Sequence, residues 1–485
     1  MFTSELWHGK AASRYAIDQS IRFNEADSPY MQKTYSGNGS RTTWSFSFWT
    51  KLGKSPPYNT TRGNFLIAYN TTSGAQEDIR IEGSNQQLQW FTHDDGATSI
   101  LADLKTTQYL RDHSAWYHIL CVADRTNAVA SERQRMYING QRVTDFATET
   151  YPSKDAEGHV GKSADVHYIG SRGGNSSTRF DGYMAEINYL DGLAYDPSFF
   201  GEFNSSGIWV PKEYTGSYGT NGFKIDGRDA SDLADDESGN GNDYATSGLA
   251  SHDQVADSPT NNFPTFNPIY ADSTGINNVT LANGNLQGTG TSGQFDHKTA
   301  TFNLPQSGKW YFEYYLGGRY DGIGICIVGQ EGSITGGYGF GALSTSQGFG
   351  FQDNVVYNSN SATVNFGIGN QNAGDILNCA FDVDNDKVFL GVNGTYYAAD
   401  AGNDGNPSTG ANPTVTTTFS LSTNDIILGF QLSSSSGSAY LNFGQEGTFA
   451  GNKTAGGNSD ANGIGNFFNS VPSGYLALCT KNLGS

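Results

Sequence analysis

Two short acidic turns hold the residues best suited to bind a metal ion. Asp94 and Asp95 precede a glycine, and Asp384 and Asp386 flank an asparagine in a second turn. Carboxylate and amide oxygens are the ligands that Ca²⁺ prefers, although neither turn has the ligand spacing of an EF-hand loop. The sequence leaves two interpretations open, structural turns or a calcium site, and suggests no other cofactor.

Aromatic side chains offer a second kind of chemistry, the stacking of a sugar ring. A flat aromatic face complements the apolar face of a pyranose, and by residue type the candidates are Trp90, Tyr109, Trp116 and Trp209. The competing interpretation is packing, because buried Trp and Tyr side chains contribute large apolar areas to a core.

Motifs of the common enzyme classes are absent from the sequence. It contains no Gly-x-Ser-x-Gly nucleophile motif, no His-Glu-x-x-His zinc motif and no phosphate-binding loop ending in Gly-Lys-Ser/Thr. Its four cysteines are far apart and have no zinc-site spacing. We therefore expect neither an enzymatic site nor a disulfide framework.

The charge and the apolar runs exclude two classes of partner. The formal net charge is -20, and such an acidic surface repels a phosphate backbone, so we expect no nucleic-acid binding. No apolar run approaches the length needed to cross a bilayer, and the N-terminal residues lack a signal-peptide pattern. We expect no membrane insertion.

The elements that must position these residues are β-strands. The chain holds 62 Gly, 27 Tyr and 29 Phe but only 16% charged residues, a balance that suits pleated surfaces joined by tight turns. In residues 44–52, Trp44, Phe46 and Phe48 share one face of a strand and the serines between them the other. The sequence predicts an all-β fold.

The same unit occurs in both halves of the chain: a strand, a polar turn, a strand and Asn-Gly. It spans residues 116–140 in the first half and 374–394 in the second, and Asn-Gly between alternating segments is typical of β-hairpins. Because 485 residues exceed one core, we predict two tandem β-sandwiches. The expected parts are an N-terminal arm (1–17), a first sandwich (18–210), a polar connector (211–265) and a second sandwich (266–485).

Each predicted sandwich resembles a known fold. The first resembles the concanavalin A-like jelly rolls of the laminin-G-like group, on residues 20–23, 28–31, 43–51, 116–119, 137–140, 168–170 and 180–187. The second resembles a SPRY-type sandwich, on residues 308–313, 322–325, 338–341, 374–394 and 441–444. The first resemblance implies that the rim of the jelly roll is a candidate site for a calcium ion, since some laminin-G-like jelly rolls hold one there.

The combination of the two folds is similar to virion structural or tail-fibre-like proteins of tailed bacteriophages, especially marine ones. Three connecting segments carry this resemblance further: residues 214–223, 238–243 and 257–262. It implies a component of the virion exterior, made in the host cytoplasm. Its expected partners are other virion proteins and host surface glycans, and the usual symmetry of such appendages suggests a homotrimer.

A glycosidase is the enzymatic alternative, because laminarinase-type enzymes share the jelly-roll fold. Retaining enzymes need two carboxylates about 5 Å apart, which this group places on one strand in a Glu-x-Asp-x-x-Glu-like pattern. The nearest match starts at Glu186, but Asn188 takes the middle position and the second glutamate is missing. We predict a non-enzymatic protein. The open alternatives are a polysaccharide-degrading glycosidase of the virion and a purely structural capsid or connector protein without a receptor role.

Overall fold

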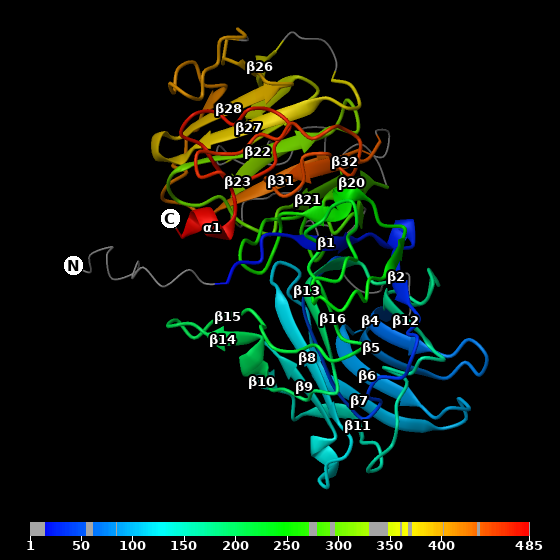
Figure 1. Cartoon of the computed structure of the whole chain (residues 1–485). Helices are drawn as coiled ribbons and strands as arrows, with labels where there is room; N and C mark the ends of the chain where they lie inside the picture. The colour runs from blue at the N-terminus through cyan, green and yellow to red at the C-terminus, as the bar shows by residue number, and fades with distance from the viewer. Residues whose placement is uncertain are drawn as a thin grey trace.

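The fold of the chain consists almost entirely of β-strands (Figure 1). The computed structural model describes residues 15–54, 62–83, 85–270, 279–291, 296–328, 348–358, 361–366, 371–400, 402–433 and 437–484. Within these ranges the sole α-helix is α1 (Thr480–Leu483). The predicted all-β class with two tandem sandwiches is confirmed.

The first sandwich is built from two antiparallel sheets, seen in the lower half of Figure 1. The first sheet has the order β10 (Gln141–Arg142), β9 (Gln134–Ile138), β8 (Tyr117–Asp124), β3 (Thr43–Leu52), β13 (Gly182–Asp191), β1 (Ser20–Phe23) and β18 (Gln254–Val255), with β16 (Phe223–Ile225) paired to β13. The second sheet has the order β11 (Phe146–Thr150), β7 (Ile100–Tyr109), β6 (Gln87–His93), β5 (Gln76–Glu82), β4 (Arg62–Tyr69), β12 (Val166–Gly170), β2 (Tyr30–Lys33) and β17 (Ala245–Ser247).

Alternation along β3 fills the space between these sheets. Trp44, Phe46 and Phe48 are fully buried in the core, as their predicted common face requires. The opposite face of the sheet is also covered, because Phe200 and Tyr214 of a later segment form a second apolar cluster over it. Burial on both faces explains why nearly every residue of β3 is inaccessible to solvent.

The predicted polar connector (211–265) is wrong, because much of this segment belongs to the first sandwich. β16 pairs with β13, β17 with β2 and β18 with β1. Phe223, Ile225 and Tyr244 of the segment lie in the core of the first sandwich. A few apolar residues at strand positions are thus enough to complete both sheets, although the composition of the segment is polar.

The second sandwich, in the upper half of Figure 1, also has two sheets. The larger one has the order β19 (Val279–Ala282), β20 (Gln287–Gly290), β32 (Ala439–Asn442), β22 (Lys309–Tyr315), β27 (Ile376–Asp382), β28 (Lys387–Val392) and β29 (Thr395–Tyr397), with β30 (Val415–Thr416) paired to β28 and β33 (Leu476–Ala477) paired to β22. The smaller one has the order β21 (Asp296–Thr299), β31 (Ile426–Leu432), β23 (Gly322–Ile327), β24 (Gly348–Gln352), β25 (Val355–Asn358) and β26 (Ser361–Asn365).

Aromatic rings hold the two sheets of the second sandwich together. The Phe312 ring of the larger sheet lies 5.7 Å from Phe381, 5.9 Å from Phe430 and 4.8 Å from Phe443, measured between centroids. All four side chains are buried. Such rings contribute both buried area and specific pair geometry, so they define one core for this half of the chain.

The Asn-Gly dipeptides form tight turns in both sandwiches, as predicted. Asn139 and Gly140 join β9 to β10, and Asn393 and Gly394 join β28 to β29. The φ angles are 48° and 74° in the first turn and 51° and 85° in the second. Positive φ at both central residues is the type I′ geometry, whose twist matches the flanking strands.

Each turn asparagine also binds the strand beside its hairpin. Asn139 donates its N–H to the His118 carbonyl and accepts the His118 N–H on Oδ1, both at 2.8 Å. Asn393 makes the same pair with Ile376, at 2.8 and 2.9 Å. In both sandwiches, therefore, the same pair of hydrogen bonds joins the turn asparagine to the strand next to its hairpin, β8 in the first and β27 in the second.

We expect Asn393→Ala to lower the free energy of unfolding by about 2 kcal/mol. Alanine loses the side-chain acceptor for Ile376 and is strained in the left-handed region. Asn393→Gly is the matched control, because it loses the same side-chain hydrogen bonds, to Ile376 and to Asp375 at 2.9 Å, without the backbone strain, and its expected cost is about 1 kcal/mol. Urea denaturation of the two variants measures both costs. Equal stability of the Ala and Gly variants would contradict the assigned backbone strain.

The two sandwiches are in direct contact. The Tyr183 hydroxyl on β13 donates to the Gly284 carbonyl of the second sandwich at 2.6 Å. In return, the Asn285 amide donates to the Gly53 carbonyl at 2.7 Å. Because these contacts are buried, the loops on both sides of the junction are held in fixed positions.

Candidate functional site

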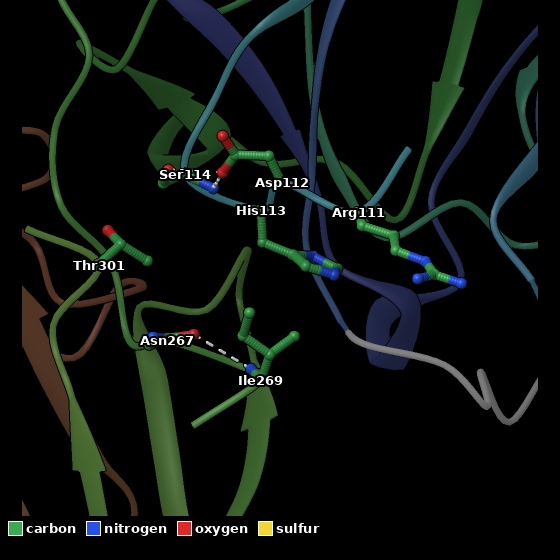
Figure 2. Close-up of a pocket in the computed structure, with 7 residues that line it drawn as sticks. All are labelled: Arg111, Asp112, His113, Ser114, Asn267, Ile269 and Thr301. Atoms are coloured by element: carbon green, nitrogen blue, oxygen red, sulfur yellow. Dashed lines mark hydrogen bonds between the residues drawn. The ribbon is translucent and has the colours of Figure 1, made fainter. Parts of the chain in front are cut away.

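A pocket of about 330 Å³ lies at the junction of the two sandwiches (Figure 2). The loop between β7 and β8 provides one wall, and residues of the segment before β19, together with Thr301 after β21, provide the other. Its lining residues are Arg111, Asp112, His113, Ser114, Asn267, Ile269 and Thr301. The pocket thus combines parts of the chain far apart in sequence.

Arg111 supplies the positive charge of this pocket. Its side chain is exposed, and the guanidinium carbon lies 4.4 Å from the centroid of the Tyr109 ring. Among the residues that the structure describes, no carboxylate forms an ion pair with Arg111. A guanidinium that rests on an aromatic ring keeps its planar set of donors for a ligand anion.

The loop that carries Arg111 is fixed by two neighbouring residues. Asp112 accepts the Ser114 N–H at 2.8 Å and the Ser114 hydroxyl at 2.6 Å. The buried His113 ring donates from Nδ1 to the Gly53 carbonyl at 2.8 Å, and burial lowers the pKa of this imidazole. A neutral, anchored histidine therefore positions the loop and does not itself present a charge.

The second sandwich contributes polar and apolar groups to the opposite wall. Asn267 accepts the Ile269 N–H on Oδ1 at 3.2 Å, and within the described residues its amide nitrogen has no partner. The Thr301 hydroxyl oxygen accepts the Thr265 N–H at 3.0 Å and keeps its proton for another acceptor. The Ile269 side chain is 64% exposed and offers an apolar contact.

The structure does not support a stacking role for Trp90 and Trp116. Trp90 is 0% and Trp116 is 9% exposed, so neither presents a ring face to a sugar. The indole N–H of Trp90 donates to Glu77 at 3.0 Å, and that of Trp116 donates to Asp257 at 3.1 Å. Both are packing residues with satisfied indole donors, which corrects the prediction.

The other two predicted aromatics are at different places on the surface. Tyr109 is 39% exposed and its ring contacts Arg111, although Tyr109 is not itself a lining residue of the junction pocket. Trp209 is half-buried in the hairpin of β14 (Gly201–Phe203) and β15 (Trp209–Pro211), away from this pocket. A Cβ on Gly140 would lie 2.5 Å from the Trp209 ring, so this ring packs against the Asn-Gly turn.

The first predicted calcium turn is occupied by internal contacts. Asp94 accepts the Thr98 N–H at 2.7 Å and its hydroxyl at 2.6 Å. Asp95 forms ion pairs with Lys162 at 2.6 Å and Arg41 at 3.5 Å, and the hydrogen bond from Lys162 lowers the pKa of Asp95. Cations at this distance neutralise the carboxylate that a calcium ion would need.

The second predicted calcium turn has the geometry of a hairpin connection. Asp384 accepts the Gly308 N–H at 2.9 Å, and Asp386, with φ of 54°, accepts the Leu421 N–H at 2.6 Å. In the described ranges, no group of three or more His, Cys, Asp or Glu side chains could hold a metal ion. These contacts favour the structural interpretation of both turns.

Glu186, the nearest match to a glycosidase carboxylate, is 7% exposed. It accepts the Tyr15 hydroxyl at 2.8 Å and pairs with Lys224 at 3.3 Å. Its φ of 49° coincides with a register shift between β13 and β3. Burial raises the pKa of Glu186, but Tyr15 and Lys224 take the carboxylate that an incoming sugar would need.

The comparisons with known proteins bear on the first sandwich. Residues 26–193 match the family model described as the concanavalin A-like lectin/glucanases superfamily, so the first sandwich is similar to that superfamily over these residues. No curated protein sequence gives a significant match. No helix within the described ranges is long and apolar enough to span a membrane.

Similar solved structures come from several kinds of protein. One is a heptameric SAP-like pentraxin from Limulus polyphemus, at 13% identity and a TM-score of 0.27, covering 37% of this chain and 78% of that chain. Another is the TRIM65 PSpry domain, at 14% identity and a TM-score of 0.24, covering 37% and 88%. Domains LG4-5 of the mouse laminin alpha1 chain match at 10% identity and a TM-score of 0.26, covering 87% and 84%.

Sequence reasoning named Tyr109, whose ring contacts Arg111, but none of the residues that line the junction pocket. Arg111 and Ser114 belong to a polar loop, and Asn267 and Ile269 lie more than 150 positions later. Only the contact between the sandwiches brings them together. The usable signal was a basic residue two positions after an aromatic residue, in the loop that begins where β7 ends at Tyr109.

Proposed function

We propose that the protein is a non-enzymatic component of a phage virion exterior, and that the junction pocket binds an acidic sugar of the host surface. The unpaired Arg111 guanidinium on the Tyr109 ring carries the binding part of this proposal. The resemblance of the sequence to tail-fibre-like proteins supports the virion part. Neighbouring virion proteins and copies of the chain in a trimer are the proposed partners.

The chemistry of the pocket favours a sugar that carries a carboxylate. Arg binds a carboxylate through two parallel N–H groups, which adds geometric specificity to the charge attraction. The amide of Asn267 and the hydroxyl of Thr301 suit sugar hydroxyls, and exposed Ile269 suits the apolar face of the ring. A few polar groups beside apolar surface are typical of small-molecule sites.

Arg111→Ala is expected to weaken binding of a glucuronate-terminated trisaccharide by about tenfold or more. Isothermal titration calorimetry at low salt measures this change, with the matching glucose-terminated trisaccharide as the neutral probe. Arg172→Ala is the matched control, because Arg172 lies 4.6 Å over the Tyr69 ring, outside the pocket. Unchanged binding in Arg111→Ala, or an equal loss in Arg172→Ala, would overturn the assignment.

Adsorption to host cells tests the virion role. The purified protein is expected to bind intact host cells and, in excess, to block infection, and imaging of the particle should place the chain on its exterior. Failure to adsorb would favour a purely structural capsid or connector protein. Turnover of host glycan that is lost in Glu186→Gln would favour the glycosidase.

A further inference from the structure

A larger groove, of about 520 Å³, also lies between the two sandwiches. The first sandwich provides residues that follow β1 and residues between β17 and β18, and the second provides residues of β20 and β32, the turn before β20, and Ala450. The lining residues are Asn24, Ala26, Asp27, Gly248, Leu249, Ala250, His252, Asp253, Asn283, Gln287, Tyr440 and Ala450. None of them lines the junction pocket.

One wall of this groove is a chain of hydrogen-bonded amides. The Asn283 amide donates to the Gln287 carbonyl at 2.6 Å, and the Gln287 amide donates to the Ser438 hydroxyl at 2.7 Å. Asn24 accepts the Asn283 N–H at 3.1 Å and links the row to the first sandwich. Side chains held in this way lose little conformational entropy when a ligand binds.

These amides keep hydrogen-bonding capacity for a ligand. A side-chain amide nitrogen carries two protons. Asn283 and Gln287 each donate one of these protons to the hydrogen bonds described above, so each retains one N–H for a ligand. Within the described residues the Asn283 Oδ1 accepts no hydrogen bond. Donors and an acceptor side by side match the hydroxyl groups of a sugar, which both donate and accept.

An aromatic platform lies beside the amide row. Tyr440 on β32 is the direct cross-strand partner of Gln287, so their side chains share one face of the sheet. The Tyr440 ring is half-buried, and its centroid lies 5.4 Å from that of Tyr315 on the adjacent strand. The two rings are nearly perpendicular and Tyr315 is not among the lining residues, so the stacking face for a sugar is that of Tyr440, which Tyr315 supports from the side.

The carboxylates that line the groove, beside His252, disfavour an acidic ligand. Asp27 and Asp253 contribute carboxylates, and the lining contains neither Lys nor Arg. Asp253 is already paired with the buried Arg22 at 3.2 Å, which leaves Asp27 as the exposed charge. A ligand carboxylate would meet repulsion here, in contrast to the junction pocket with Arg111.

We propose that this groove binds a neutral oligosaccharide, with one sugar ring on Tyr440 and its hydroxyls on the amides of Asn283 and Gln287. The site is separate from the junction pocket and takes a different class of glycan, so the proposal does not rest on the acidic-sugar assignment. The two sites together give the molecule contacts with two parts of a heteropolysaccharide.

Isothermal titration calorimetry with cellopentaose, laminaripentaose and maltopentaose tests this site on the full chain. At least one of the three is expected to bind with a Kd below about 10 mM, and Tyr440→Ala is expected to weaken that binding by about tenfold or more. Gln287→Met, which keeps the side-chain length, is expected to weaken it as well. Circular dichroism checks that both variants fold.

Arg111→Ala separates the two sites. It is expected to leave binding of the neutral pentasaccharide unchanged while it removes binding of the acidic trisaccharide. Absence of binding for all three pentasaccharides, or full binding in both folded groove variants, would overturn the groove proposal. Loss of neutral binding in Arg111→Ala would also overturn it, because the ligand would then occupy the junction pocket.

Discussion

Glu313→Ala is expected to lower the free energy of unfolding by about 4 kcal/mol. The Glu313 carboxylate on β22 is fully buried and accepts four hydrogen bonds: from the Tyr311 hydroxyl at 3.0 Å, the Asn469 N–H at 2.7 Å, the Phe468 N–H at 2.9 Å and the Asn442 amide at 3.1 Å. Alanine leaves these donors without an acceptor, and each buried, unsatisfied donor costs about 1–3 kcal/mol. Urea denaturation measures the loss.

Two controls isolate the role of the carboxylate. Glu313→Gln keeps the shape of the side chain, but its amide nitrogen faces hydrogen-bond donors. Its expected loss of unfolding free energy is therefore smaller than that of Glu313→Ala and larger than that of Glu237→Ala. Glu237→Ala removes an exposed glutamate and is expected to change stability by less than about 0.5 kcal/mol. If Glu313→Ala costs no more than Glu237→Ala, the carboxylate does not hold the C-terminal segment to the sheet.

The pH dependence of the Glu313→Gln loss has a definite sign. Burial raises the pKa of Glu313 in spite of its four donors, so the folded state binds a proton more tightly than the unfolded state does. The stability that this carboxyl contributes is therefore greatest below the ordinary glutamate pKa and decreases as the pH rises through the folded-state pKa. Since glutamine does not titrate, the gap between wild type and Glu313→Gln should narrow with rising pH.

The local parts of the fold were predictable because short-range chemistry determines them. Asn-Gly favours positive φ at two successive positions, so both hairpins followed from the dipeptides Asn139-Gly140 and Asn393-Gly394. Alternation in residues 44–52 identified a central strand, since side chains of a strand point to opposite faces in turn. Neither inference needs knowledge of distant residues.

The sites were less predictable because burial depends on the whole chain. Trp90 and Tyr109 are both aromatics at strand positions, yet Trp90 is fully buried and Tyr109 is 39% exposed beside Arg111. Residue type does not distinguish them. The polar composition of the segment 211–265 predicted a connector. Its short strands nevertheless complete the sheets of the first sandwich, because such strands need few apolar residues.

Lys51→Met is expected to lower the free energy of unfolding by about 3–5 kcal/mol. Lys51 on β3 is 1% exposed, and its ammonium donates to the Asp257 carboxylate at 2.7 Å, the Asn262 side-chain oxygen at 2.7 Å and the Phe263 carbonyl at 2.8 Å. Methionine keeps most of the apolar stem but leaves Asp257 buried without its cation. Differential scanning calorimetry measures the loss.

The same substitution is expected to weaken the junction between the sandwiches. Residues 257–263, which Lys51 holds, lead from β18 into the core of the second sandwich. The Asn262 side-chain amide also donates to the Ser114 carbonyl at 2.6 Å, beside the junction pocket, and the Asn262 backbone N–H donates to the Thr480 hydroxyl oxygen at 2.8 Å near the C-terminus. Without the contacts of Lys51, the two sandwiches are expected to unfold independently, so a single unfolding transition should become two.

A double-mutant cycle distinguishes the ion pair from simple loss of packing. Lys51→Met with Asp257→Asn removes both charges, so it is expected to cost at least 1 kcal/mol less than the sum of the single losses, a rough lower limit for a coupled pair. Lys154→Met is the control, because its pair with Asp155 is at 3.9 Å and both side chains are more than half exposed; its expected cost is below about 0.5 kcal/mol. Strictly additive losses at Lys51 and Asp257 would show that the two charges do not stabilise each other, and the junction would then depend on its other contacts, such as the hydrogen bond from Tyr183 to Gly284.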